Sequence, residues 1–318
     1  MSFTPLFLTV SLLVFTNIKS ADDNIIRTCE YEAIVKRAAL PQEPKLQLDD
    51  LFKDTEFVQA FIQRKNCMSN ARRREIAQRL AFSKISRFNY IFKAPQIPGY
   101  ILKLGPIHWT NSFGGSAVRE HHVTNRNVSR VAYQQLAEDV IERNHLKHVR
   151  VVKKYLYRIP KEHDTKQIIK LSDDNYVVVA EDSHESLLSL EENITRFKDV
   201  TEEQLEELRI IAREAYMPDL KIHNCIFGKD DKIYIIDTEQ TSRAQESDFF
   251  LKNAARMQAD TESGLQRVES LRRVQDPSYC TTMIEVFQQL EPYLQMGLEP
   301  DDKPTVCTEK LIELANHW

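Results

Sequence analysis

Glycine, clustered cysteine and long apolar runs are all scarce in this sequence. Seven glycines occur in 318 residues, and three of them, Gly105, Gly114 and Gly115, fall in one segment. The five cysteines form no Cys-x-x-Cys pair and no cluster with histidine, so the sequence indicates no metal site built on them. Beyond residue 20 no apolar run approaches the roughly 20 residues that a membrane-spanning helix needs, so we expect no membrane span in the mature chain.

Charge of one sign is not concentrated either. The net charge is −4, and the basic and acidic residues are interspersed. Because no basic face is extensive enough to neutralise a run of phosphates, nucleic acid is not an expected partner. The chain is 42% hydrophobic and 28% charged, which is enough apolar content for a sizeable core. Its length fits one large two-lobed domain or two small domains.

The N-terminus has the pattern of a secretory signal peptide at residues 1–20. Residues 5–18 are almost entirely apolar, and the small residues Ser20 and Ala21 precede two aspartates. A short membrane anchor is the alternative, but about 14 apolar positions are too few to span a bilayer. The pattern therefore predicts a secreted or exported protein. Disulfide pairing among the cysteines stays open, as does use of the glycosylation sequons at Asn127 and Asn193.

The order of expected elements follows from hydrophobic periodicity and turn residues. Residues 21–85 predict a helical N-terminal extension. An amphipathic helix is expected at residues 128–144, with Asn127 or Ser129 as its N-cap, and Thr201 to Gln204 read as the capping box of a later helix. Strands are expected at residues 88–93, 100–104, 148–158 and 175–180, and further helices from about residue 247.

The most informative segment runs from residue 217 to residue 241. Asp219-Leu220-Lys221 is followed after two residues by Asn224, and Asp237 follows Asn224 by 13 residues at the end of an expected strand. Taken singly, such acidic residues commonly cap turns or end hairpins. Together they resemble the catalytic loop and the metal-binding aspartate of the protein kinase-like superfamily. The resemblance implies an α+β, two-lobed protein kinase-like fold at residues 86–318, with lobes at about 86–181 and 182–318, preceded by the helical extension.

The resemblance also implies roles for individual residues in transfer of a phosphoryl group from ATP. Asp219 would orient the attacking hydroxyl or accept its proton, and Lys221 would contact the transferred group. Asn224 and Asp237 would hold Mg²⁺. Lys103, on the expected strand 100–104, would contact the nucleotide phosphates. A glutamate of the helix 128–144 would hold Lys103, with Glu138 favoured over Glu142.

Several residues depart from the pattern of ordinary protein kinases. Met217 and Pro218 stand where the family usually has His and Arg, and Asp237-Thr238-Glu239 lacks the glycine of Asp-Phe-Gly. Asp-x-Glu is similar to the aminoglycoside phosphotransferase and choline kinase branch, whose acceptors are small molecules. Residues 93–99, taken as the phosphate-covering connection, contain one glycine. Two kinase-like functions remain open: an exported, atypical phosphotransferase acting on a protein or small-molecule acceptor, and a pseudokinase-like binding module without turnover. A third alternative is a helical exported protein in which the kinase pattern is coincidence, which requires the strands at 100–104 and 176–180 to be absent.

Overall fold

The computed structural model describes residues 32–62, 69–84, 91–103, 120–160, 176–238, 254–281 and 284–285. The predicted signal peptide at 1–20, the Gly114-Gly115 segment and Glu239 lie outside the described residues. The described part of the chain is mixed α+β, as the sequence predicted. None of its helices has both the length and the apolar character needed to cross a membrane.

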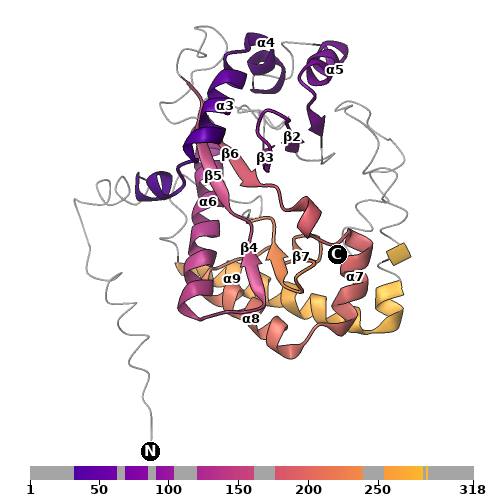
Figure 1. Cartoon of the computed structure of the whole chain (residues 1–318). Helices are drawn as coiled ribbons and strands as arrows, with labels where there is room; N and C mark the ends of the chain where they lie inside the picture. The colour runs from indigo at the N-terminus through magenta and orange to yellow at the C-terminus, as the bar shows by residue number, and fades with distance from the viewer. Residues whose placement is uncertain are drawn as a thin grey trace, which may run out of the picture.

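Five antiparallel strands form the larger sheet, in the order β1-β2-β3-β6-β5 (Figure 1). They are β1 (Ser83–Lys84), β2 (Ile91–Lys93), β3 (Tyr100–Lys103), β6 (Tyr176–Glu181) and β5 (Lys154–Arg158). The hairpin of β2 and β3 and the buried strand β6 were expected. β1 was not expected, because two residues are too short for a periodic signal, and it adds an edge strand within the range predicted to be helical.

The N-terminal extension covers one face of this sheet. It contains α3 (Gln42–Phe52), α4 (Thr55–Phe57), the π-helical turn η1 (Val58–Ile62) and α5 (Asn70–Arg79), which lie above the strands in Figure 1. Phe52 and Phe57 are fully buried in one cluster with the sheet residues Leu102, Tyr157 and Val179. The extension is therefore part of the hydrophobic core of this half of the protein.

Helix α6 (Glu120–Arg143) covers the other face. Val128 and Val131 pack with the sheet residues Leu156 and Val178. The helix begins at Glu120, at least two turns before the predicted start, so the prediction of Asn127 or Ser129 as N-cap is wrong. Asn127 lies inside the helix, and its side-chain amide donates to the Tyr176 carbonyl oxygen of β6 at 2.7 Å.

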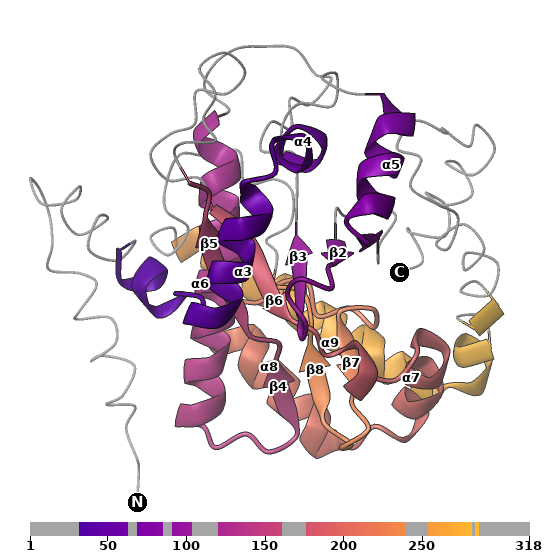
Figure 2. The same cartoon turned by 45° about the horizontal axis from the view of Figure 1, so that its top comes forward.

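A second, three-stranded sheet has the order β4-β8-β7, seen side by side in Figure 2. It consists of β4 (Val149–Val151), β8 (Ile233–Ile235) and β7 (Cys225–Phe227). The single strand predicted at 148–158 is in fact two strands in different sheets. The chain crosses between them at Val152, whose N–H donates to the Ile235 carbonyl at 3.1 Å, and Lys153, whose carbonyl accepts from Glu181 N–H at 3.0 Å. Continuous apolar character cannot reveal such a crossing.

Helices surround the smaller sheet. They are α7 (Leu190–Arg196), α8 (Glu202–Glu214) and α9 (Ala254–Arg272), with the short 3₁₀ turns η5 (His184–Ser186), η6 (Phe197–Asp199) and η8 (Arg273–Gln275). The predicted capping box of Thr201 and Gln204 is confirmed at the start of α8. Buried residues of α8, such as Leu205 and Leu208, join the strand residues Ile233 and Ile235 in one core.

The burial of the extension yields a testable prediction. Phe52 is fully buried, with ring centroids 5.3 Å from Phe57 and 4.8 Å from Tyr157. We expect Phe52→Ala to lower the free energy of unfolding by about 3–5 kcal/mol, because it leaves a cavity between the extension and the sheet. The matched control is Leu46→Ala in the same helix, where the side chain is 52% exposed. Chemical denaturation measures both; similar losses for the two variants would contradict the shared core.

Candidate functional site

The loop before β7 alternates between buried and accessible side chains. Leu220 and Ile222 are buried in the core, whereas Asp219, Lys221 and His223 are partly accessible. The apolar residues therefore anchor the loop and present the three polar side chains together. The loop starts at the buried Met217, which packs in the same core.

Asn224 fixes the carboxylate of Asp219. Its side-chain nitrogen donates to Asp219 Oδ2 at 2.8 Å and to the Asp219 carbonyl oxygen at 3.0 Å. Lys221 Nζ lies 2.9 Å from the other carboxylate oxygen, Oδ1. Both N–H groups of the Asn224 side-chain amide donate to Asp219. The amide oxygen, Asn224 Oδ1, is therefore the atom of this side chain that can face a cation.

Asp237 is brought to the same loop by the hairpin of β7 and β8. Cys225 pairs with Ile235, and Ile236 N–H donates to the Asn224 carbonyl at 2.9 Å, so continuation of this register places Asp237 beside the loop. Across the sheets, Lys103 Nζ donates to Asp237 Oδ1 at 3.3 Å. Lys103 is the last residue of β3, and Asp237 follows the end of β8, so the contact joins the larger sheet to the segment that leaves the smaller sheet.

A buried lysine next to this contact was not predicted. Lys154 opens β5, is 1% exposed, and donates from Nζ to Thr238 Oγ1 at 2.7 Å. The Thr238 hydroxyl in turn donates to the Arg130 carbonyl of α6 at 2.6 Å. These bonds fix the residue that follows Asp237 between β5 and α6. No sequence pattern indicates this burial, since a lysine in a strand is normally solvated.

Positive charges determine the ionisation of Asp237. Burial by itself would raise the pKa of this carboxyl, but the charges of Lys103, Lys154 and Arg130 outweigh burial and lower the pKa to about 2. The pKa of Lys154 is far below its ordinary value, because the side chain is buried and also faces the charges of Lys103 and Arg130. Asp237 is therefore a stable anion at neutral pH.

His223 is a further titratable group of the loop. Its pKa is lowered, first by burial and then by the charge of Lys221, while the carboxylates of Asp219 and Asp237 act in the opposite direction. The imidazole is therefore mostly neutral at pH 7. That both carboxylates act on one imidazole is consistent with a single site containing Asp219 and Asp237.

Two residues far from the loop in sequence support it. Asn193 of α7, which is fully buried, donates to the carbonyls of Ile222 and Cys225 at 2.9 and 3.0 Å and accepts from Phe227 N–H at 2.8 Å. On α9, Gly264 lies so close that a Cβ there would stand 2.3 Å from the Met217 carbonyl oxygen. Helices α7 and α9 thus hold the two ends of the loop.

The prediction that Glu138 holds Lys103 requires correction. The Glu138 carboxylate pairs instead with Arg37 of the extension, 3.4 Å away, and Arg37 also pairs with Asp139 at 2.7 Å. The part of α6 that reaches the site is the turn containing Arg130, which lies about 12 Å along the helix from Glu138. Periodicity identified the helix but not the turn that faces the strand lysine.

The connection between β2 and β3 also differs from expectation. Ile91 pairs with Lys103 and Lys93 pairs with Ile101, so residues 94–99 turn at the end of the hairpin away from Lys103. Ile97 is fully buried, and the Gly99 carbonyl accepts from Asp182 N–H at 2.8 Å. This connection is a packed turn away from Lys103, so its low glycine content says nothing about phosphate binding. The link between β1 and β2, at residues 85–90, lies outside the described residues.

Both sequon asparagines are buried in the folded chain, which disfavours attachment of a glycan to either side chain after folding. Asn127 and Asn193 are 8% and 0% exposed, and the side-chain nitrogen to which a glycan would be attached donates hydrogen bonds to backbone carbonyls in each. Of the described cysteines, Cys225 and Cys280 are buried free thiols.

Comparison of the chain with protein-family models, with curated proteins and with solved structures gives no match in any of the three.

Asn193 provides a prediction about how the loop is supported. Asn193→Ala leaves two carbonyls and one N–H without partners, and we expect a loss of about 3 kcal/mol in the free energy of unfolding. Thr195→Ala is the matched control, because it abolishes the same sequon at an exposed position and should change stability by less than about 0.5 kcal/mol. Urea unfolding of both variants compares them. Equal losses would show that Asn193 does not act through these bonds.

The lowered pKa of Asp237 predicts a pH dependence of stability. In the unfolded chain the pKa of this carboxyl is near 4, so its native interactions stabilise the fold fully above that pH and are lost as the pH falls towards about 2. We expect Asp237→Asn to lower the free energy of unfolding by about 2 kcal/mol near neutral pH. The difference from wild type should shrink below about pH 4, as measured by unfolding at a series of pH values. A difference that stays constant to pH 2 contradicts this assignment.

Proposed function

We propose that the chain is an atypical, exported phosphotransferase of kinase-like fold, which transfers the γ-phosphoryl group of ATP, with Mg²⁺, to an acceptor hydroxyl. The observation that carries the proposal is the 3.3 Å contact between Lys103 of the five-stranded sheet and Asp237 after β8. These residues are 134 positions apart in sequence. The resemblance to kinases requires three parts: a strand lysine, a metal-binding carboxylate and a fixed Asp219–Asn224 pair.

The arrangement of elements also supports a two-lobed interpretation. A five-stranded antiparallel sheet with one long helix against its face precedes a second, largely helical part that contains the loop and its hairpin (Figure 1). Apart from β4, which precedes β5 in sequence but belongs to the smaller sheet, the chain passes from the first part to the second after Glu181, as a hinge would require. In this proposal the extension belongs with the first lobe, because it shares a core with the sheet.

The residues of the site fit a magnesium–nucleotide complex chemically. Asn224 Oδ1 and the Asp237 carboxylate are oxygen donors of the kind that Mg²⁺ prefers. When bound, the complex would supply the phosphoryl group and electrostatic neutralisation of its charge. Asp219, held by Asn224, would orient the acceptor hydroxyl and take up its proton. Lys221, 2.9 Å from Asp219, would lie near the transferred group. Lys103 would bind phosphate oxygens.

The charges around Asp237 favour joint binding of metal and nucleotide. Lys103, Lys154 and Arg130 all stabilise the anionic form of this carboxylate, and the same positive field disfavours a lone divalent cation. Phosphate groups would reverse that field. Mg²⁺ would therefore bind mainly together with ATP. Lys154 would act as a positioning residue, since its bond to Thr238 fixes the segment that carries Asp237.

Point variants test the assigned roles. We expect Asp219→Asn to lower turnover by about 10²–10⁴-fold while leaving Mg²⁺-dependent ATP binding nearly unchanged, because the variant cannot accept a proton. Asp237→Ala should abolish the magnesium dependence of ATP binding. Asp230→Asn, an exposed position in the same hairpin, is the control. Release of labelled γ-phosphate and nucleotide-induced thermal shift are the two measurements. Absence of any nucleotide response in the wild type would refute the proposal.

The second candidate is a binding module that retains the fold without turnover. It is favoured by the direct Lys103–Asp237 ion pair, in which the two groups satisfy each other and compete with phosphate and metal. In that case wild type would show a thermal shift with Mg²⁺ and ATP, no release of γ-phosphate, and no effect of Asp219→Asn.

The Asp237-x-Glu239 pattern favours a small-molecule acceptor if turnover occurs.

A further inference from the structure

Three potential metal ligands meet at the opposite end of the smaller sheet from Asp237. His148 immediately precedes β4, while Glu203 and Glu207 lie one helical turn apart on α8. β4 and β8 are parallel, with Val149 opposite Ile233 and Val151 opposite Ile235. The cluster therefore lies where these strands begin, and Asp237 lies beyond the point where β8 ends. It is distinct from the site described above and does not depend on the proposed function.

Glu207 is held in place by the backbone. Its Oε1 accepts from Lys147 N–H at 2.8 Å, and its Oε2 accepts from the N–H groups of His148 and Val149 at 2.8 and 3.0 Å. A carboxylate has about four acceptor positions, so three bonds leave about one, on Oε1. Glu207 is 7% exposed, and its oxygen is fixed in direction before any ligand binds.

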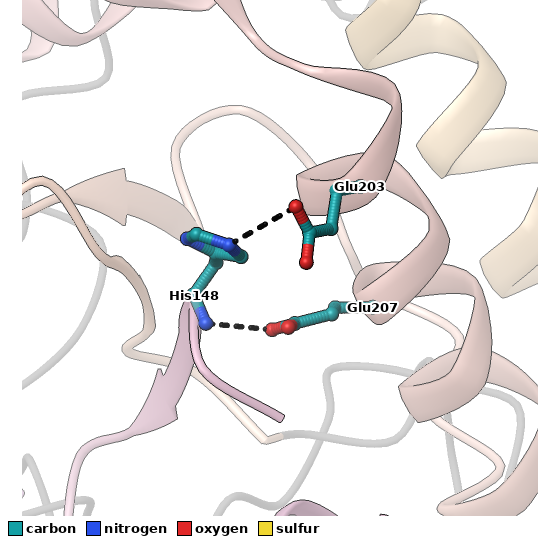
Figure 3. Close-up of side chains that lie close together, drawn as sticks. All are labelled: His148, Glu203 and Glu207. Atoms are coloured by element: carbon teal, nitrogen blue, oxygen red, sulfur yellow. Dashed lines mark hydrogen bonds and ion pairs between the residues drawn. The ribbon is translucent and has the colours of Figure 1, made fainter. Parts of the chain in front are cut away.

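His148 and Glu203 complete the arrangement (Figure 3). His148 Nε2 is 3.6 Å from Glu203 Oε2, which is too long for a hydrogen bond. With metal–ligand bonds of about 2.0–2.2 Å, two ligands of a tetrahedral zinc ion are separated by about 3.3–3.6 Å. One ligand atom from each of the three residues lies within 4.8 Å of the others. The Glu203 side chain is 69% exposed, so it can rotate to close the remaining gap.

We propose that His148, Glu203 and Glu207 bind one divalent transition-metal ion, with zinc as the expected ion and a water molecule as its fourth ligand. An imidazole together with carboxylates is a ligand set that suits zinc better than magnesium or calcium. The ion would connect the turn between α6 and β4 to the start of α8. No sequence motif indicates the site, because His148 is 55 positions from Glu203 and 59 positions from Glu207.

Zinc titration of the full chain, freed of metal with a chelator, tests the site by calorimetry. We expect wild type to bind one zinc ion that His148→Ala and Glu203→Gln each weaken by about 100-fold or more. His184→Ala removes an exposed histidine outside the cluster and should leave zinc affinity unchanged. Glu207 is not substituted, because its bonds to three N–H groups are structural.

Cobalt substitution provides a second readout, because a tetrahedral cobalt site absorbs strongly in the visible range. We expect this absorption in wild type and in His184→Ala, and its loss in Glu203→Gln. Since Glu203 is largely exposed, its variant remains informative even if His148→Ala does not fold. Binding of zinc by wild type that neither variant weakens, or no binding by wild type, would overturn the proposal.

Discussion

The contact between Lys103 and Asp237 is the interaction on which the arrangement of the site depends. Lys103 ends β3 of the larger sheet, and Asp237 lies two residues after the end of β8 of the smaller sheet. The backbone supports this meeting at Val152 and Lys153, where one continuous segment leaves the smaller sheet and enters the larger. The two sheets are therefore held in a fixed relation by both covalent continuity and charge.

Burial of Lys154 beside this contact has a cost in stability. A lysine that is 1% exposed and faces two other cations has a lowered pKa, so the native state disfavours its charge below the ordinary pKa of lysine. Stability from this group therefore rises as the pH increases towards the ordinary pKa of lysine, just as stability from Asp237 rises with pH in the acidic range. Natural chains commonly retain such unfavourable groups where function requires them. Lys154 adds to the positive field that an anionic ligand would neutralise.

The sequence predicted those parts of the site that are local. Asp219, Asn224 and Asp237 belong to one loop and hairpin whose spacing is visible in the chain, and Lys103 was assigned to a strand with a partner strand close in sequence. Lys154, Arg130 and Asn193 were missed, because their importance arises from burial and from contacts between distant elements. Glu138 was assigned by its position in a helix, but α6 is 24 residues long and another turn faces the site. Long-range contacts, such as that of Glu207 with the residues before β4, leave no periodic signal.

A structure of the protein with Mg²⁺ and a non-hydrolysable ATP analogue would test the central claim most directly. The account predicts that Lys103 Nζ turns from Asp237 to a phosphate oxygen and that one magnesium ion lies between Asn224 Oδ1 and the Asp237 carboxylate. A nucleotide bound elsewhere, with the Lys103–Asp237 ion pair intact, would contradict it.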